Sequence, residues 1–280
     1  LNRRLRSALE RERPDVMLEC GGERVEPASV EFARRIGVKT VLWTIDAVKD
    51  FPDPRLNNAA AYDYVFCGGT EMLHYLQGRR LRRPAQWLPF GCDPELHAPA
   101  PAGNGAAQGA QAVFVGSLHR DLYPRRLALL EEAAAACRLG LWGPGADKLL
   151  PPLKNCARGG ETTPEQWRKI YSDAPITLCL HYQDPAGKLV CNQASPRVFE
   201  ALACGAFVLC DSQPDVMTLF EDGKHMAFFS SPGGLREKIA YYLAHEEERK
   251  AIAGAGRAEA LARHTYACRV KKILDTAVAG

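Results

Sequence analysis

The sequence predicts an α/β protein built from two Rossmann-like halves. Short apolar runs alternate with amphipathic segments of helical spacing, which is the rhythm of strands and helices in a parallel sheet. The rhythm stops at a stretch rich in Pro, Gly and Ala, at 97–111, and then restarts. A length of 280 residues is enough for two compact domains. We therefore expect two parallel sheets, joined by a flexible linker at 97–111.

The first half contains about three strands, fewer than the five or six of a full doubly wound domain. Buried strands are predicted at 15–20, 39–46 and 63–69. Helical spacing is found between them, in PASVEFARRIG, and after them, in TEMLHYLQGRR. The N-terminal domain is thus expected to be incomplete, and an opening Leu in place of Met is compatible with a piece of a longer protein.

The second half repeats the alternation over a longer stretch. Strands are predicted at 112–117, 138–143, 176–182, 206–211 and 225–230. Helices are predicted at 123–137, 163–174, 234–245 and 246–274. Thr163 is a plausible N-cap with Pro164 at the first helical position, which is a typical helix start.

Composition excludes several classes of protein. The 36 basic and 33 acidic side chains give a net charge of +3, too balanced to indicate a nucleic-acid partner. The sequence contains no run of 18 apolar residues, so no membrane span is predicted. The charged opening stretch has no apolar signal core. The ten cysteines form no CxxC pair and no zinc-like cluster, which favours free thiols in a reducing, cytoplasmic compartment.

The stretch SPRVFEALACGAF, at 195–207, is the strongest candidate for a ligand site. Ser195 can cap a helix that has Pro196 at its first position, and the N–H groups of such a first turn attract a phosphate. Arg197 adds a guanidinium fork, and Glu200, on the same helical face, can accept hydrogen bonds from a sugar diol. Gly205 fits the C′ position. The alternative is a solvated Arg–Glu surface pair, which contributes little to stability.

Several blocks of the sequence resemble one known family. RVFEALACG, LFEDGK and HTYACR follow one another in the C-terminal half, and VFVGSLHRDLYPRR opens it. VLWTIDAVKDF, DYVFCGG and LPFGCDPELH are weaker matches in the N-terminal half. Together they resemble the CgeB-like, or spore maturation protein-like, bacterial glycosyltransferases of the GT-B superfamily, within glycosyl transferases group 1.

The resemblance implies a GT-B fold, with two Rossmann-like domains facing across a cleft and the N-terminal one truncated. Residues 1–99 would form the acceptor-side domain and 100–265 the nucleotide-sugar-binding domain, while the helix at 266–280 would cross back to the N-terminal domain. The implied activity is hexosyl transfer from a nucleotide-diphosphate sugar to a hydroxyl of a protein, a lipid-linked glycan or a small molecule.

The resemblance also assigns donor-binding roles by position. Glu200 would bind the ribose of the donor, and Arg197 with Ser195 would face its diphosphate. Gly116 and Ser117 would let the backbone approach the donor. Apart from the resemblance, Lys188 and Arg125 could balance phosphate charge in place of a metal. Alternatively, Gly116 forms a simple tight turn and Lys188 is a solvated loop residue.

Asn192 departs from the pattern of the superfamily. Many retaining GT-B enzymes have a glutamate eight residues before the ribose-binding one, where this chain has Asn192. An amide can bind a sugar hydroxyl but carries no negative charge, so the retaining or inverting outcome stays open.

Two further residues are candidates for catalysis. Asp46 ends a predicted strand and could orient or deprotonate an acceptor hydroxyl, or merely cap the next segment. His181 ends another predicted strand and could contact the donor, or be an ordinary polar residue at a strand end. No pair of carboxylates is placed like a DxD metal site, so we expect a transferase without a metal or other cofactor.

Two other functions remain open. One is a non-catalytic subunit of this fold that binds a nucleotide sugar or a glycan, which Asn192 and the short first half favour. The other is a second enzyme class on the same architecture, such as a nucleotide-sugar epimerase or a phosphorylase. Donor conversion without an acceptor would identify an epimerase.

Overall fold

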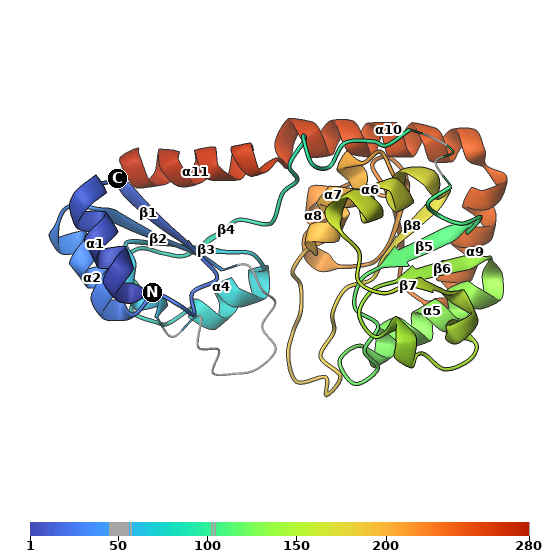
Figure 1. The fold of residues 1–280 in the computed structure, drawn as a ribbon, viewed down its shortest axis with the longest axis horizontal. Coiled ribbons are helices and arrows are strands. Elements are labelled where there is room, and N and C mark those ends of the chain that lie inside the picture. The colour runs from blue at the N-terminus through green and yellow to red at the C-terminus, as the bar shows by residue number, and fades with distance from the viewer. Residues whose placement is uncertain (45–55, 57, 102, 104, 280) are drawn as a thin grey trace. The chain divides into compact units, whose positions relative to one another are not determined.

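The computed structural model describes residues 1–44, 56, 58–101, 103 and 105–279. The chain forms two compact units, each made of several stretches. The first unit comprises 1–90, 188–193 and 267–280, and the second comprises 91–187 and 194–266. Each unit has its own parallel sheet (Figure 1).

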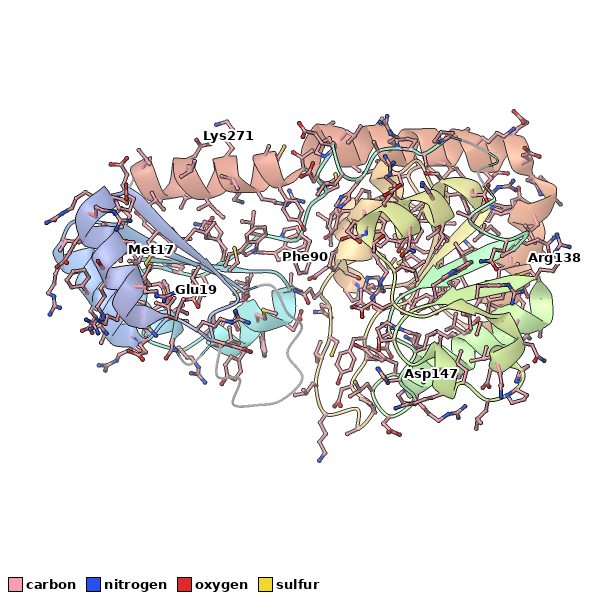
Figure 2. All side chains as sticks on the ribbon, viewed as in Figure 1. Met17, Glu19, Phe90, Arg138, Asp147 and Lys271 are labelled. Carbon is pink, nitrogen blue, oxygen red and sulfur yellow. The ribbon has the colours of Figure 1, made fainter. Side chains whose placement is uncertain are left out.

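The first unit has a four-stranded sheet in the order β1-β2-β3-β4. Its strands are β1 (Val16–Cys20), β2 (Lys39–Thr44), β3 (Tyr64–Cys67) and β4 (Gln86–Trp87), and its helices are α1 (Asn2–Glu12), α2 (Pro27–Arg35), α4 (Thr70–Leu76) and α11 (Tyr266–Ala279), with the 3₁₀ turn η1 (Ala59–Ala61). All strand pairs are parallel. Met17 and Glu19, on one face of β1, are buried (both labelled in Figure 2), and Leu18, on the other face, is exposed.

The C-terminal helix α11 is a structural part of the first unit. Ile273 and Ala277 are fully buried, and the Nε of Arg269 donates to the carbonyl oxygens of Pro89 at 2.9 Å and Phe90 at 3.0 Å. These contacts join residues about 180 positions apart in the sequence. The last helix therefore stabilises elements formed near the start of the chain.

The second unit has a six-stranded sheet in the order β10-β9-β8-β5-β6-β7. Its strands are β5 (Ala112–Val115), β6 (Leu139–Trp142), β7 (Ala157–Gly159), β8 (Ile176–Cys179), β9 (Val208–Asp211) and β10 (Ala227–Phe229). Its helices are α5 (Pro124–Ala136), α6 (Pro164–Asp173), α7 (Pro196–Ala203), α8 (Pro214–Leu219), α9 (Pro232–Ala244) and α10 (Glu246–Arg263), with the 3₁₀ turns η2 (Ala146–Lys148) and η3 (Leu153–Cys156). Helices such as α5 and α9 pack on the sheet, and the side chains buried between these helices and the sheet are apolar.

The predicted alternation of strands and helices is confirmed, with some differences. β4, β7 and α8 were not predicted, because two, three and six residues are too few for a periodic pattern. The helix α1 was not predicted either, although its 11 residues are enough for a helical pattern. The helix expected at 246–274 is divided into α10 and α11 around His264 and Thr265, where Thr265 forms a bridge with Cys92. Thr163 caps α6 with Pro164 at the helix start, as expected, and Gln166 completes a capping box that was not predicted.

The stretch expected to be a flexible linker packs on the second unit. The backbone N–H of Ala100 donates to Ser172 Oγ at 2.9 Å, and that of Ala107 donates to Asp173 Oδ2 at 2.8 Å. Ala107 and Ala110 are buried. The described residues of this stretch thus form a fixed connection along α6. None of the described helices combines the length and apolarity needed to cross a bilayer.

Candidate functional site

The strand order places a ligand crevice at one point of the second sheet. From β5 the chain passes through α5 to β6 on one side, whereas β8, reached later through α6, pairs with the other side of β5. In open α/β sheets, ligands bind at the carboxyl ends of the strands where the order reverses in this way. Gly116 and Ser117 follow β5 there, and Leu180 and His181 follow β8.

Glycines let the backbone pass closely at this edge. A Cβ on Gly143 would lie 2.0 Å from the carbonyl oxygen of Gly116, so no side chain fits there. A Cβ on Gly116 would lie 3.1 Å from the Cζ and Nε of Arg197. The N–H of Gly116 donates to the carbonyl of Trp142 at 2.9 Å, which joins the ends of β5 and β6. Gly116 therefore belongs to a close approach between backbone and Arg197.

Helix α7 begins as the sequence predicts, with one difference at its cap. Ser195 occupies the N-cap position and Pro196 the first turn, but the Ser195 hydroxyl makes no capping hydrogen bond. Gly205 follows the helix with φ +76°, as a C′ glycine does. The first-turn N–H groups are therefore not capped by the serine side chain.

Two arginines meet at the edge of the sheet around Phe114. The Cζ atoms of Arg126 and Arg197 lie 5.3 and 5.5 Å from the centre of the Phe114 ring. Arg126 is 4% exposed, and its Nη atoms donate to the carbonyl oxygens of Ser117 at 3.0 Å and Leu180 at 2.9 Å. It thereby ties the end of β8 to the loop after β5.

No carboxylate among the described residues forms an ion pair with Arg126 or Arg197. The Nη1 of Arg197 and the Nε of Arg126 are buried and have no hydrogen-bond partner in the described part of the chain. Burial, followed by the like charge of Arg197, lowers the pKa of Arg126 to about 9. Buried charges are normally paired, so this arrangement is suited to receiving an anion.

Glu200 lies one turn after Arg197 on the same helix and is half-buried. Burial raises the pKa of its carboxyl group, and the attraction of Arg197 offsets only part of that effect. No ion pair or hydrogen bond joins the Glu200 side chain to another described residue. The arrangement is not the solvated surface pair considered above, because Arg197 packs over Phe114 and Glu200 keeps its acceptor oxygens available.

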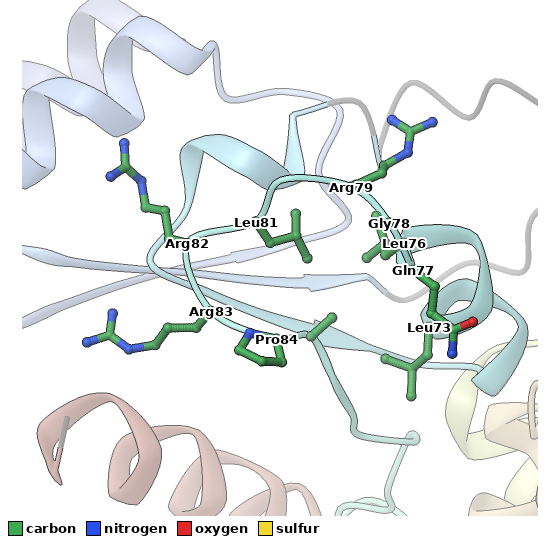
Figure 3. A pocket seen from close by; sticks show the side chains of 10 residues that line it. Leu73, Leu76, Gln77, Gly78, Arg79, Leu81, Arg82, Arg83 and Pro84 are labelled. Atoms are coloured by element: carbon green, nitrogen blue, oxygen red, sulfur yellow. The ribbon is translucent and has the colours of Figure 1, made fainter.

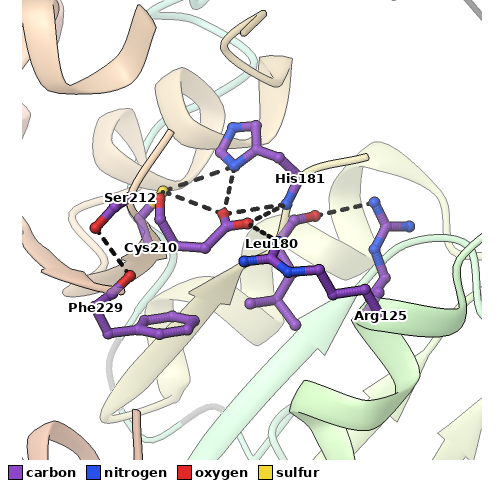
Figure 4. A network of polar contacts seen from close by, with 8 residues as sticks. Arg125, Leu180, His181, Cys210, Ser212 and Phe229 are labelled. Atoms are coloured by element: carbon purple, nitrogen blue, oxygen red, sulfur yellow. Dashed lines mark hydrogen bonds and ion pairs between the residues drawn. The ribbon is translucent and has the colours of Figure 1, made fainter. Parts of the chain in front are cut away.

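Arg125 has a different environment from its neighbour. Its Nη1 lies 3.1 Å from Asp211 Oδ2, and the Oδ1 of Asp211 lies 2.7 Å from Nδ1 of His181 (Figure 4). Burial by itself would raise the pKa of Asp211, but His181 and then Arg125 lower it below the usual value. Arg125, expected to contact the donor, is thus engaged in holding Asp211.

Cys210 completes a buried group whose potential metal-ligating atoms all lie within 4.8 Å of one another, with His181 and Asp211. Burial and then the charge of Asp211 raise the pKa of the Cys210 thiol well above its ordinary value, and the cationic Arg125 already lies 3.1 Å from the carboxylate. The carboxylate already accepts hydrogen bonds from His181 and an ion pair from Arg125. The donor set therefore fits a hydrogen-bonded network better than a metal site.

The remaining predicted site residues lie outside the second unit. Asn192 belongs to the first unit, where its backbone N–H donates to Glu71 Oε2 at 3.3 Å and its amide Nδ2 to Thr70 Oγ1 at 3.1 Å. The exposed Lys188 belongs to the same unit. Asp46 lies outside the described residues.

A cavity of about 430 Å³ in the first unit is lined by leucines and by Arg79, Arg82 and Arg83 (Figure 3). It lies along the connection from α4 to β4. A helix-to-strand connection enters a parallel sheet at the amino ends of the strands, opposite the edge where ligands bind. This cavity is therefore not part of the candidate site.

Arg126 and Asp211 were not predicted as site residues. The spacing of Arg126 with Leu129, Leu130 and Ala133 places it on the apolar face of α5, and that pattern was a readable signal. Asp211 ends a buried strand, which is the criterion that selected Asp46. Both residues could have been found by asking which charged groups interrupt an apolar pattern.

A family model described as glycosyl transferase-like matches residues 125–275, which is more than half of the chain. The match includes α5 with Arg126, the network of Asp211, and α7 with Arg197 and Glu200. No curated protein sequence matches the chain significantly.

Solved structures show the same fold at low sequence identity. A glycosyltransferase from Rickettsia africae has a TM-score of 0.70 at 11% identity, covering 98% of this chain and 79% of its own. Sucrose-phosphate synthase from Thermosynechococcus elongatus has a TM-score of 0.70 at 13% identity, covering 97% and 75%. Anabaena HepE in complex with UDP and glucose has a TM-score of 0.68 at 14% identity, covering 99% and 81%. These likenesses confirm the predicted α/β fold of the GT-B type.

Proposed function

Because the chain belongs to the glycosyl transferase-like family, we propose that it transfers a sugar from a nucleotide-diphosphate sugar to a hydroxyl acceptor. In this reaction the bond between the anomeric carbon and the diphosphate breaks, a bond to the acceptor oxygen forms, and the acceptor proton is released. The donor binds at the carboxyl edge of the second sheet, where β5 and β8 end.

The observation that carries the proposal is the pair of arginines without a carboxylate partner in the described ranges. Arg126 and Arg197 place two positive charges beside Phe114, and each has a buried nitrogen without a hydrogen-bond partner among the described residues. A diphosphate supplies the missing negative charge and accepts these hydrogen bonds. The uncapped start of α7, at Ser195, adds N–H groups and the positive end of the helix dipole.

Glu200 is suited to the ribose of the same ligand. It lies one turn further along α7, its oxygens have no partner among the described residues, and its pKa is raised by burial. A carboxylate in such surroundings gains from two hydroxyl donors, as a ribose diol provides. The close approach of Gly116 and Gly143 leaves backbone, rather than side chains, beside the phosphates.

The arginine pair can stabilise the leaving diphosphate without a metal ion. Charge that develops on the leaving phosphate is offset by groups already fixed in place. We expect unchanged turnover in excess chelator. A loss restored by Mg²⁺ or Mn²⁺ would contradict this part of the proposal.

Binding is the first test. A thermal-shift panel would use UDP-, GDP- and dTDP-glucose with the free diphosphates, on wild type, Arg197→Met and Glu200→Ala. UDP-glucose comes first because HepE has been solved with it. A matching ligand raises the midpoint of wild type through its binding to the folded state. Arg236→Met is the matched control, because Arg236 is exposed on α9 and pairs with Glu132.

The results separate the parts of the site. Arg197→Met should lose most of the shift for sugar nucleotide and free diphosphate alike, and Arg236→Met should keep it. Glu200→Ala should lose the preference for a ribonucleotide over its 2′-deoxy form. If no nucleoside diphosphate stabilises wild type, the donor site is wrong.

A second candidate function is a non-catalytic subunit that binds a nucleotide sugar. The engagement of the Asn192 amide with Thr70 favours it, because this position then offers no carboxylate and its amide donor is already used. Release of free nucleoside diphosphate over time, in the presence of acceptor mixtures, would support the enzyme. Tight binding without any release would support the subunit.

The more specific assignments also belong to this proposal. The quoted blocks support a CgeB-like, bacterial enzyme of the hexosyltransferase type. We assign nucleotide-sugar binding to residues 100–265, because the proposed site is built from β5, α5, α7, β8 and β9. Lys188 and Asp46 keep the roles predicted for them, in phosphate binding and acceptor activation.

A further inference from the structure

His181 and Asp211 form a buried pair at the carboxyl ends of two neighbouring strands. His181 follows β8 and Asp211 ends β9, and these strands pair in parallel. The Nδ1 of His181 lies 2.7 Å from Asp211 Oδ1, and the His181 backbone N–H donates to the same oxygen at 3.2 Å. The two side chains are 2% and 3% exposed. The imidazole is therefore fixed by its backbone and by its ring.

The carboxylate determines which ring nitrogen carries the proton. An ionised carboxylate only accepts hydrogen bonds, and His181 with Arg125 lowers the pKa of Asp211 below its usual value. The Nδ1 atom must then be the donor, so in the neutral ring Nε2 presents a lone pair. Nε2 is buried and has no hydrogen-bond partner within the described residues. A buried acceptor without a donor is costly, and a ligand group is one way to satisfy it.

The pair lies beside the proposed diphosphate site. Arg126 donates through Nη2 to the carbonyl of Leu180, the residue before His181, and shares the Phe114 ring with Arg197. Phosphate oxygens are acceptors and cannot satisfy the lone pair of Nε2. A hydroxyl can, and the ribose diol is already assigned to Glu200. The remaining hydroxyls of the donor are those of its transferred sugar.

We propose that Nε2 of His181 accepts a hydrogen bond from a hydroxyl of the transferred sugar, and that Asp211 is a positioning residue that fixes the tautomer for this contact. Arg125 holds Asp211 through its ion pair at 3.1 Å. The inference rests on the proposed function, since it needs a sugar nucleotide at this edge. It makes this side of the crevice a determinant of sugar selectivity.

The test compares a sugar nucleotide with its free diphosphate. Titration calorimetry would measure UDP-glucose and UDP, with the GDP and dTDP pairs as alternatives, on wild type, His181→Phe, His181→Gln and Asp211→Asn. We expect His181→Phe and Asp211→Asn to bind UDP-glucose about 5- to 10-fold more weakly, the scale of one hydrogen bond. UDP should change less than about twofold. His181→Gln retains an acceptor oxygen and should recover part of the affinity.

A cycle with deoxy-sugar analogues identifies the hydroxyl. The analogue that lacks the bonded hydroxyl should bind wild type and His181→Phe equally, whereas the other analogues should still distinguish them. A purely structural role for His181 would instead weaken UDP and UDP-glucose together.

Each outcome has a separate meaning. If neither compound of any pair binds wild type, the proposed function fails. If wild type binds both, and every variant weakens both equally or neither, only the sugar contact is overturned. Retained UDP binding by His181→Phe shows that this variant is folded, so the test does not depend on Asp211→Asn being stable.

Discussion

Two buried charged groups, Glu19 in the first unit and Arg126 in the second, differ in how completely their hydrogen-bonding atoms are satisfied. In the first unit, Glu19 accepts hydrogen bonds from the Tyr62 hydroxyl and from the backbone N–H groups of Arg24 and Val25, each at 3.3 Å. In the second unit, Arg126 and Arg197 each keep a buried nitrogen without a hydrogen-bond partner among the described residues.

A buried charge that is fully hydrogen-bonded contributes to stability, whereas one that is incompletely bonded is suited to binding a ligand. A satisfied buried carboxylate holds its own fold together. A cation left incomplete at a strand edge costs stability in the free protein and gains it back from an anion. The pKa shifts of the two groups fit this contrast. Burial and then Glu19 raise the pKa of Tyr62, which keeps its hydroxyl a donor to Glu19. Burial and then the like charge of Arg197 lower the pKa of Arg126.

The largest effect is expected in the first unit, from Glu19→Ala. The change leaves the Tyr62 hydroxyl and two backbone N–H groups without an acceptor, which should destabilise the protein by about 2–3 kcal/mol. Urea unfolding measures the loss, with the exposed Glu31 on α2 changed to Ala as control. Affinity for UDP should persist at temperatures where the variant is folded. A variant as stable as the control would contradict a structural role for Glu19.

Arg197→Met should have the next largest effect, on binding instead of stability. Loss of charge-assisted hydrogen bonds to a diphosphate should weaken UDP binding by about 30- to 100-fold. The unfolding free energy should change by less than about 1 kcal/mol, because Arg197 has no ion pair among the described residues to lose. Calorimetry and urea unfolding on one preparation give both numbers. A large loss of stability with intact binding would reverse the comparison.

Glu200→Gln should stabilise the free protein at neutral pH, by about 1 kcal/mol, the scale of a single polar substitution. Burial raises the folded-state pKa of Glu200 above its unfolded value, with Arg197 offsetting part of the rise. The protonated group therefore contributes stability that is fully present below the unfolded pKa, near 4.3, and lost as pH rises through the folded pKa.

The advantage of the Gln variant should thus be greatest above the folded pKa and vanish near pH 4. Unfolding midpoints at pH 4 and pH 7.5 measure this difference. An advantage that is equal at both pH values would show that the charge of Glu200 is not responsible.

The smallest effect is expected from Thr177→Val, inside β8. The Thr177 hydroxyl is buried and has no hydrogen-bond partner among the described residues, but it lies in mid-strand, away from the carboxyl edge. Replacement by an apolar group of similar shape should be neutral or stabilising by up to about 1 kcal/mol. UDP binding should stay unchanged. A loss of binding would show that unsatisfied groups outside the edge also belong to the site.

The sequence predicted the positions of strands better than it predicted the residues of the candidate site. Apolar runs placed most strands within one to three residues, because burial on both faces of a parallel sheet leaves a clear pattern. Two- and three-residue strands such as β4 and β7 leave no such pattern. The strand order, which locates the crevice, depends on pairings between distant segments and cannot be read from periodicity.

The candidate site shows the same limit. Arg197 and Glu200 were found because their spacing along one helix is local information. The sequence could not report that Arg125 pairs with Asp211, because the two residues are 86 positions apart. Asn192 meets Thr70 across 122 residues, and no local pattern reports that contact. Arg126 differs from these contacts, because its place on the apolar face of α5 is local information that the sequence offered but that was not used.

The build of the first unit has a consequence for synthesis on the ribosome. Its sheet is made from residues 16–87, but the unit also includes α11, where Ile273 and Ala277 are buried and Arg269 donates to the carbonyls of Pro89 and Phe90. Translation proceeds from the N-terminus, and domains generally fold in that order. Here the unit that is begun first is completed last, after the second unit has emerged. A premature stop just after residue 266 would therefore leave the first unit without its last helix, although most of that unit is synthesised before the second.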